Sequence, residues 1–416
     1  MMERSKFMKM PKIRFNDFKN EWKKEKLCNI VSRITRKNKN LESHTPLTIS
    51  AIEGLVSQLT YFNNIVASSN ISGYYLIKNG EFAYNKSYSN GFPYGSIKRL
   101  DKFDMGVLST LYIVFALNKQ NTSILSDYLV LFFNTTLWYH EVAKRAEEGA
   151  RNHGLLNISA DDFFDINIIY PKDLLEQQKI ASYFQKLESL IQTTSKKLAT
   201  LKRIKAASLQ SMFPQEGETV PKVRFKGFEE EWSLKYVFEL LCERNELSPQ
   251  SPEFPLMAFI ANNGIAEKGE RYDRSALVND VINKQYKRTY YGDFIYSSNN
   301  LETGSIGLNT YGKATISPVY SIFYCTLNSD SNFVGYCMTR KSFIKEMIKW
   351  RQGVMYGQWR IHEKDFLRIK VLVPSLPEQQ QIGTYFRNLD QQISLQTQRL
   401  EKLKQIKTAC LDKMFV

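Results

Sequence analysis

Residues 173–213 read DLLEQQKIASYFQKLESLIQTTSKKLATLKRIKAASLQSMF, and residues 375–415 read SLPEQQQIGTYFRNLDQQISLQTQRLEKLKQIKTACLDKMF. Apolar residues recur in alternating steps of four and three from Ile180 to Leu201 in the first stretch, and from Ile382 to Leu403 in the second. A narrow apolar stripe at this spacing, sustained for more than three heptads, predicts a coiled-coil helix. The sequence therefore predicts two long helices.

Polar residues give these two helices further predicted features. Thr194 and Gln396 occupy matching positions inside the stripes, where we expect them to set the register. Asp173 with Glu176, and Ser375 with Glu378, have the spacing of a capping box, so we expect each glutamate to cap its own helix. The glutamines that follow are not explained by capping, and contact with a partner subunit is one interpretation of them: Gln177, Gln178, Gln379 and Gln380.

The chain is an internal duplication. The segment 11–15, Pro-Lys-Ile-Arg-Phe, recurs 210 residues later as 221–225, Pro-Lys-Val-Arg-Phe, and Met212-Phe213 recurs 202 residues later as Met414-Phe415. Looser matches between these points keep the same order. The repeated unit of roughly 200 residues is far longer than the short repeats of solenoid proteins.

The region before each helix predicts a globular domain of mixed structure. Short apolar runs at 290–296, 319–324 and 367–373 predict strands, whereas 126–145 and 342–351 predict helices. We therefore expect an α/β (α+β) fold, with two globular domains separated by two long antiparallel coiled-coil helices. The expected boundaries are 1–172, 173–213, 214–374 and 375–416.

Net charge narrows the class of partner. Lys and Arg number 57 against 42 acidic residues, a formal charge of +15. A field of that sign favours a polyanion, with nucleic acid as the first candidate. A membrane surface is the competing interpretation, but the sequence has neither a basic amphipathic helix nor a lipidation signal.

Compartment and membrane association follow from other features. The start of the sequence has no apolar core of a signal peptide, and the longest apolar run, 107–117, is too short to span a bilayer. The five cysteines have no paired spacing, which fits a reduced cytoplasm better than a disulfide framework. We therefore expect a cytoplasmic protein.

No catalytic motif is complete. Residues 307–314 resemble a phosphate-binding loop until Ala314, where the required Ser or Thr is missing. His44, His140, His153 and His362 lack metal-ligand spacing. The sequence also contains no Pro-Pro pair of the kind expected in a methyl-transfer motif. We therefore expect a non-catalytic chain with no metal or cofactor of its own.

Two long helices that each carry one apolar stripe bury it most simply against each other. Each would span roughly 57 Å at 1.5 Å per residue. Antiparallel packing would relate the repeats by an approximate two-fold axis, and two DNA-reading domains so related would dock on half-sites about one helical turn or more apart. The alternative is that the helices only dimerise the protein or join two halves of an enzyme.

The repeated motifs carry a family resemblance. Paired Pro-Lys-x-Arg-Phe segments lead to Glu21-Trp22 and Glu231-Trp232, both helices begin with Glu-Gln-Gln, and both end with Leu-x-x-Leu-Lys-x-x-Lys. Repeated in this order, across about 11–416, they resemble the specificity subunits of type I restriction–modification systems. This resemblance implies that each globular part is a target recognition domain reading one half of a split sequence in double-stranded DNA.

The same resemblance implies partners and their cofactors. The helices would set the spacer and bind two modification (methyltransferase) subunits, which methylate adenine using S-adenosylmethionine. Two restriction subunits would add an endonuclease and translocase that uses ATP and magnesium. Because the two recognition regions here are only loosely alike, the two half-sites should differ.

The resemblance does not identify base-reading residues, so we nominate loops by residue type. Asn and Gln suit adenine edges, whereas Arg suits guanine or phosphate. We interpret Lys98 and Arg99 as phosphate contacts. The full set of candidates is Lys86, Tyr88, Asn90, Tyr94, Lys98, Arg99, Arg151, Asn152, His153, Ser298, Asn299, Asn300, Met355, Tyr356 and Gln358. The alternative is that the tyrosines are core residues and the asparagines form turns.

Two other function classes stay open at this point. One is a stand-alone enzyme, such as a duplicated nuclease with an unrecognised site. The other is an architectural or regulatory DNA-binding protein with a coiled-coil spine. Turnover by the pure protein would favour the first, and failure to recover a methyltransferase in a pull-down would favour the second.

Overall fold

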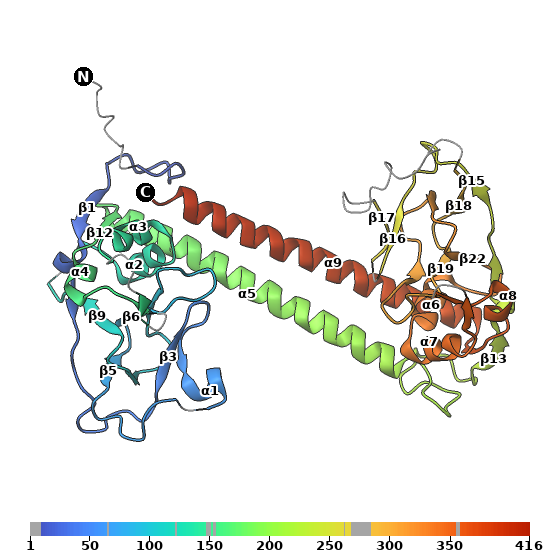
Figure 1. Ribbon diagram of the computed structural model, residues 1–416, viewed down its shortest axis with the longest axis horizontal. Helices are drawn as coiled ribbons and strands as arrows, with labels where there is room; N and C mark the ends of the chain where they lie inside the picture. Colours follow the sequence, from blue (N-terminus) through green and yellow to red (C-terminus); the bar gives the residue numbers. More distant parts are fainter. Residues whose placement is uncertain are drawn as a thin grey trace. The chain divides into compact units, whose positions relative to one another are not determined.

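The computed structural model describes residues 10–64, 66–120, 123–146, 151–152, 155–261, 263–267, 284–354 and 358–416 (Figure 1). The chain forms two compact units. Unit 1 comprises Met1–Thr194 with Arg399–Val416, and unit 2 comprises Ser195–Gln398. Each unit therefore contains one globular part and portions of both long helices.

Unit 1 is built on a four-stranded antiparallel sheet. Its order is β2 (Val31–Arg33), β9 (Ile113–Leu117), β6 (Phe82–Asn85) and β7 (Ser96–Arg99). The other strands form antiparallel pairs: β1 (Lys23–Lys26) with β12 (Asn167–Tyr170), β3 (Leu47–Ser50) with β4 (Gly54–Ser57), β5 (Tyr75–Lys78) with β8 (Met105–Leu108), and β10 (Arg151–Asn152) with β11 (Leu155–Leu156). The short helices are η1 (Leu27–Asn29), α1 (Gln58–Phe62), α2 (Ser126–Phe133), α3 (Leu137–Ala143) and α4 (Ala160–Phe164).

Unit 2 repeats this central sheet. The order is β14 (Leu241–Glu243), β22 (Ser321–Cys325), β19 (Phe294–Tyr296) and β20 (Ile306–Leu308). The remaining strands are β13 (Ser233–Tyr236) with β25 (Lys370–Val373), β16 (Ala258–Ile260) with β17 (Gly264–Ala266), β23 (Gln352–Val354) with β24 (Gln358–Arg360), and a sheet of β15 (Leu247–Ser248), β18 (Tyr286–Thr289) and β21 (Ala314–Ile316). The short helices are η2 (Val237–Glu239), α6 (Ser331–Met338), α7 (Lys341–Ile348) and α8 (Glu363–Phe366). The shared strand order shows the duplication in the fold as well as in the sequence.

The expected mixed class is confirmed, with one correction in the helices. The predicted helix 126–145 is two helices, α2 and α3, because the chain turns between them. At this turn, the hydroxyl of Thr135 donates to the carbonyl of Phe132 at 2.7 Å. Side-chain bonds of this kind compete with the helical backbone pattern.

The two long helices are confirmed as α5 (Leu174–Ser211) and α9 (Leu376–Lys413), each of 38 residues. They run antiparallel within each unit. In unit 1, Lys407 Nζ lies 2.5 Å from Glu188 Oε2, and the Tyr183 hydroxyl lies 3.4 Å from Cys410 Sγ. These contacts pair residues that ascend along α5 with residues that descend along α9.

Unit 2 has the corresponding contacts with the roles of the helices exchanged. Lys205 Nζ lies 2.5 Å from Asp390 Oδ1, and the hydroxyls of Ser208 and Tyr385 lie 2.9 Å apart. Lys205 lies 202 residues before Lys407 in the sequence. The duplication is therefore visible in individual helix-to-helix contacts.

Each long helix ends inside the core of the unit in which it did not begin. Helix α5 begins in unit 1, yet Phe213, just after its end, packs 5.9 Å from Trp232 in unit 2. Helix α9 begins in unit 2, yet Phe415 packs 5.6 Å from Tyr128 and 6.3 Å from Trp22 in unit 1. The repeated Met-Phe pairs are thus core anchors, a role that the sequence pattern alone did not indicate.

The expected role of the helix-start glutamates is wrong. Glu176 does not bond back to its own helix terminus but accepts two bonds from Arg14, at 2.6 and 2.7 Å. Glu378 does the same with Arg224, at 2.7 and 2.8 Å. Asp173 does act as a cap, because its carboxylate accepts a bond from the Leu175 amide. The glutamates instead tie each Pro-Lys-x-Arg-Phe segment to a long helix.

Candidate nucleic-acid interface

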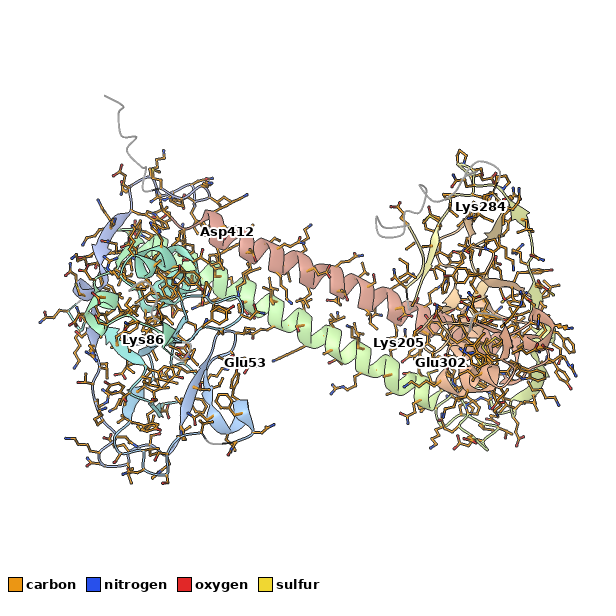
Figure 2. The ribbon with its side chains drawn as sticks, viewed as in Figure 1. Glu53, Lys86, Lys205, Lys284, Glu302 and Asp412 are labelled. Carbon is orange, nitrogen blue, oxygen red and sulfur yellow. The ribbon has the colours of Figure 1, made fainter. Side chains whose placement is uncertain are left out.

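The two candidate loops of unit 1 lie together. The loop between β6 and β7 (86–95) contacts the hairpin of β10 and β11, because the Leu156 amide donates to the Lys86 carbonyl at 3.0 Å. The ammonium of Lys86 also donates to the Ile158 carbonyl at 3.2 Å, and its burial lowers the pKa of Lys86. We call this loop and hairpin loop pair 1; Lys86 is labelled in Figure 2.

Unit 2 brings the equivalent loops together. The loop between β19 and β20 (297–305) contacts the hairpin of β23 and β24. The Ser298 hydroxyl accepts a bond from the Ile361 amide at 2.9 Å, and the Asn299 side chain accepts one from the Trp359 amide at 2.6 Å. Arg351 reinforces the contact through two bonds to Glu302, at 3.0 and 2.7 Å. We call this loop and hairpin loop pair 2.

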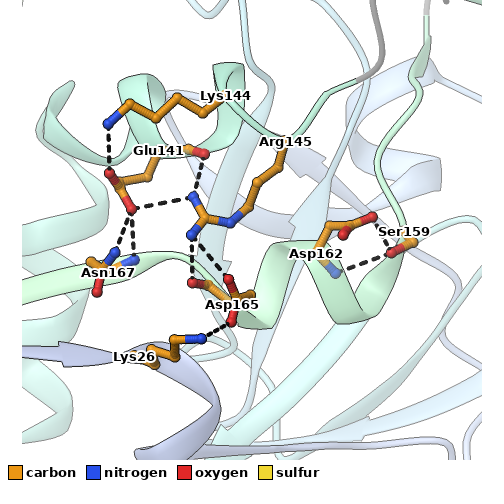
Figure 3. Close-up of polar contacts among 8 residues, drawn as sticks. All are labelled: Lys26, Glu141, Lys144, Arg145, Ser159, Asp162, Asp165 and Asn167. Atoms are coloured by element: carbon orange, nitrogen blue, oxygen red, sulfur yellow. Dashed lines mark hydrogen bonds and ion pairs between the residues drawn. The ribbon is translucent and has the colours of Figure 1, made fainter.

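A polar cluster lies between helix α3 and strands β1 and β12 (Figure 3). Arg145, just after α3, bonds to Glu141 at 3.2 Å and to Asp165 at 3.1 Å. Glu141 accepts two further bonds from Asn167 at 3.1 and 2.8 Å, and Lys26 pairs with Asp165. The cluster therefore joins the segment after α3 to the end of α4 and to strands β1 and β12.

The charge state of this cluster is set by its hydrogen bonds. Burial raises the pKa of Glu141, but the side-chain and backbone bonds from Asn167, together with Lys144, outweigh burial and lower the pKa to about 2. Glu141 is therefore ionised at neutral pH. An ionised carboxylate held by several donors makes a stronger anchor than a neutral one.

Several candidates in unit 1 make contacts within the protein. Tyr88 and Asn90 are exposed, whereas Tyr94 is half-buried, with its ring centroid 5.3 Å from that of Tyr139. Lys98 donates to the Asn134 side chain at 2.9 Å, and burial, with a smaller effect of Lys407, lowers the pKa of Lys98 to about 8. A phosphate contact by Lys98 would compete with Asn134.

Arg99 is held within unit 1 more strongly than Lys98, by two ion pairs. Its guanidinium pairs with Asp101 at 2.6 Å and with Asp127 at 2.7 Å. Burial lowers the pKa of Arg99, but the bonds to these two carboxylates outweigh burial and raise it overall. The positive charge of Arg99 is thus balanced inside unit 1.

The candidates on the hairpins differ in how far they are described. His153, Met355 and Tyr356 lie outside the described residues, and Arg151 and Asn152 are described only as backbone of β10. In loop pair 2, Asn299, Asn300 and Gln358 are exposed and Ser298 is half-buried. Trp359, which the sequence did not nominate, is 49% exposed between two polar residues of β24.

The glutamines that were candidates for partner binding divide into two kinds. Gln177 is buried, accepts a bond from the Leu125 amide and donates to two carbonyls, those of Ser123 and Pro171. Gln379 is likewise buried and accepts a bond from the Asp330 amide. The structure therefore corrects the prediction that Gln177 and Gln379 contact a partner. Their side-chain amides hold each long helix against its own globular part. Gln178 and Gln380 are exposed, and the prediction stays for them.

The loop at 307–314 has the conformation of a turn between strands. Strand β21 follows it, whereas a phosphate-binding loop must lead into a helix. The Asn309 side chain closes the turn by accepting a bond from the Tyr311 amide at 2.9 Å and donating to the Gly312 carbonyl at 2.7 Å. The loop is therefore a strand connection.

Two features are absent from the described residues. In the part of the chain that the structure describes, no group of three or more His, Cys, Asp or Glu side chains could hold a metal ion. Over the same residues, every helix is too short or too polar to cross a lipid bilayer.

Comparisons with known proteins show what the chain resembles. Residues 234–405 match the family model described as the type I restriction modification DNA specificity domain. The S subunit of a type I restriction-modification system from M. genitalium has a similar structure, with a TM-score of 0.58, 14% identity and coverage of 98% of this chain and 99% of that chain. The HsdS subunit from Thermoanaerobacter tengcongensis matches with a TM-score of 0.45 and 15% identity over 96% of this chain and 99% of that one. No protein with a curated description matches the chain. Over residues 234–405, the chain is therefore similar to the type I restriction modification DNA specificity domain.

Proposed function

We propose that this chain is the non-catalytic specificity subunit of a type I restriction–modification complex, and that each unit reads one half of a bipartite site in double-stranded DNA. The observation that carries the proposal is the equivalence of loop pairs 1 and 2. Both join the loop after the third strand of the central sheet to a two-stranded hairpin. An equivalent surface in each unit suits two half-sites.

The exposed side chains of the loop pairs fit base reading. Asn90, Asn299 and Gln358 carry amides, which can bond bidentately to an adenine edge. The net charge of +15 supplies the sequence-independent attraction to phosphates. The two loops differ in sequence between the units, so the half-sites should differ.

The proposed partners follow from the resemblance to this family. We propose that two modification subunits bind this chain and methylate adenine with S-adenosylmethionine, and that two restriction subunits add cleavage driven by ATP and magnesium. This chain would bind none of these cofactors itself and would act in the cytoplasm. Helices α5 and α9 would set the spacer between half-sites.

Methylome sequencing tests the proposal. A host carrying this chain with its modification partner should gain one bipartite methylated motif. Exchanging residues 230–370 for those of a related subunit should change one half of the motif and leave the other half intact. A change in both halves would contradict modular reading, and a pull-down without a methyltransferase would favour an architectural DNA-binding protein.

A further inference from the structure

The hairpin of β3 and β4 in unit 1 exposes an isoleucine at its tip. Ile52 is 88% exposed in the three-residue turn between the two strands. The turn is held by a bond from the Glu53 amide to the Ser50 hydroxyl at 3.1 Å, and by Gly54 at φ +85°, a conformation that favours glycine. Glu53 is labelled in Figure 2. Ile52 therefore sits on a well-defined turn.

A cleft of about 260 Å³ lies between this turn and the loop of loop pair 1. Tyr61 of α1 and Tyr88 of the loop line it, and both are about half exposed. The remaining lining residues are Ile49, Ser50, Ala51, Ile52, Asn85, Ser87, Ser89, Asn90, Phe92 and Ser96. Each of these described lining residues is uncharged.

Helix α1, which contributes Tyr61 to the cleft, and the segment after it expose further apolar side chains. Leu59, Phe62 and Val66 are 57%, 47% and 70% exposed, and the rings of Tyr61 and Phe62 meet edge to face at 4.9 Å. Scattered exposed apolar residues are ordinary, but a contiguous group marks an interaction site. The cleft is therefore a candidate for contact with another molecule.

We infer that this cleft receives a thymine of the half-site that unit 1 reads, with Ile52 and Tyr88 against the 5-methyl group of that base. The inference rests on the proposed function. An uncharged lining does not suit phosphate, and Asn and Ser side chains suit base edges. The thymine methyl is the apolar group that DNA presents in its major groove. The cleft is also continuous with loop pair 1, since Ser87, Tyr88 and Asn90 belong to both.

The test combines protein and DNA substitutions, using the full chain and duplexes that carry the methylated motif. The half-site of unit 1 is the half left unchanged when residues 230–370 are exchanged for those of a related subunit. Replacing each of its thymines in turn by uracil removes only the methyl group. For the wild type, one such replacement should weaken binding about fourfold, the effect of one buried methyl-sized group.

The protein variants then locate the contact. Ile52→Ala should weaken binding to the thymine duplex by about the same factor and abolish the difference between thymine and uracil at that one position. Leu111→Ala is the matched control, because Leu111 is 60% exposed in another turn of unit 1 and does not line the cleft. This variant should keep the full difference.

The outcomes separate the inference from the proposed function. A half-site without an A·T pair, equal binding of all thymine and uracil duplexes, or an unchanged difference in Ile52→Ala would overturn the inference alone. Unchanged DNA binding by Ile52→Ala with reduced recovery of a partner subunit would also overturn it, and would assign the cleft to a protein. Equal wild-type binding to cognate and scrambled duplexes would overturn the proposed function.

Discussion

Arg224 and Glu378 form two parallel hydrogen bonds across 154 residues of sequence, at 2.7 and 2.8 Å. The bonds to Glu378 raise the pKa of Arg224, and the carboxylate itself is fully buried. Arg14 and Glu176 repeat the arrangement in unit 1. Each pair fastens the segment that opens a repeat to the start of the helix that closes it.

Removing one partner of this pair should destabilise unit 2 strongly. Arg224→Ala leaves Glu378 buried without its cation, which should lower the free energy of unfolding by about 3–5 kcal/mol. Arg14→Ala should cost less, because the indole of Trp22 also donates to Glu176, at 3.3 Å. Among the described residues, the equivalent indole of Trp232 has no hydrogen-bond partner. Chemical unfolding of both variants measures the difference.

Lys349→Ala is the control for this comparison. Lys349 pairs with Glu346 at the surface, and an exposed pair contributes about 0–1 kcal/mol. Equal losses for the Arg224 and Lys349 variants would show that the buried pair is not a structural fastener.

Each Met-Phe pair should stabilise the unit whose core it enters and leave the other unit unaffected. Phe415→Ala removes a ring that packs against Trp22, Tyr128 and Phe184, so it should destabilise unit 1 by about 3–5 kcal/mol. Phe213→Ala should do the same to unit 2. Hydrogen exchange resolved by peptide measures each unit separately. Loss of protection in the same unit for both variants would contradict the finding that each long helix ends in the unit in which it did not begin.

The acid stability of unit 1 should depend on Glu141. Its pKa is lowered to about 2 in the folded chain, so its contribution is fully present above the ordinary glutamate pKa of about 4.5. That contribution should be lost progressively as the pH falls from about 4.5 to 2. The stability difference between the wild type and Glu141→Gln should therefore shrink over this window in thermal unfolding at several pH values. A difference that stays constant with pH would exclude an ionised Glu141 as the anchor.

Salt dependence should separate base-reading residues from phosphate contacts. Gln358→Ala should cost about 1–3 kcal/mol on the cognate site and relax one base position, with an unchanged salt slope. Lys98→Ala should weaken all sequences alike and lower the slope by about one. Arg99→Gln is the comparison, because Asp101 and Asp127 already balance its charge and the slope should hardly change. Titrations at several salt concentrations on cognate and scrambled duplexes check this. Equal losses of affinity on both duplexes for Gln358→Ala would show that its loop does not read bases.

Helix length should set the spacer of the methylated motif. One heptad inserted into both α5 and α9 preserves the apolar stripes and should lengthen the spacer without altering either half-site. Methylome sequencing reads the result directly. An insertion into α5 alone is the control, because it breaks the match between partners such as Lys205 and Asp390. An unchanged spacer in the double insertion would contradict the role of the helices as a ruler.

The sequence by itself determined the duplication, the two long helices and the mixed fold class, because helical period and repeated motifs are local properties. It also nominated loops for DNA contact, and their contact with bases stays a prediction. Only the tertiary structure decided that Glu176 binds Arg14 rather than its own helix, that Gln177 is buried, and that Phe415 completes the core of unit 1. These pairings join residues more than 100 positions apart or depend on which face of a helix a neighbour covers. A local pattern shows that a side chain is polar or apolar, whereas its partner is chosen by the packing of the whole unit.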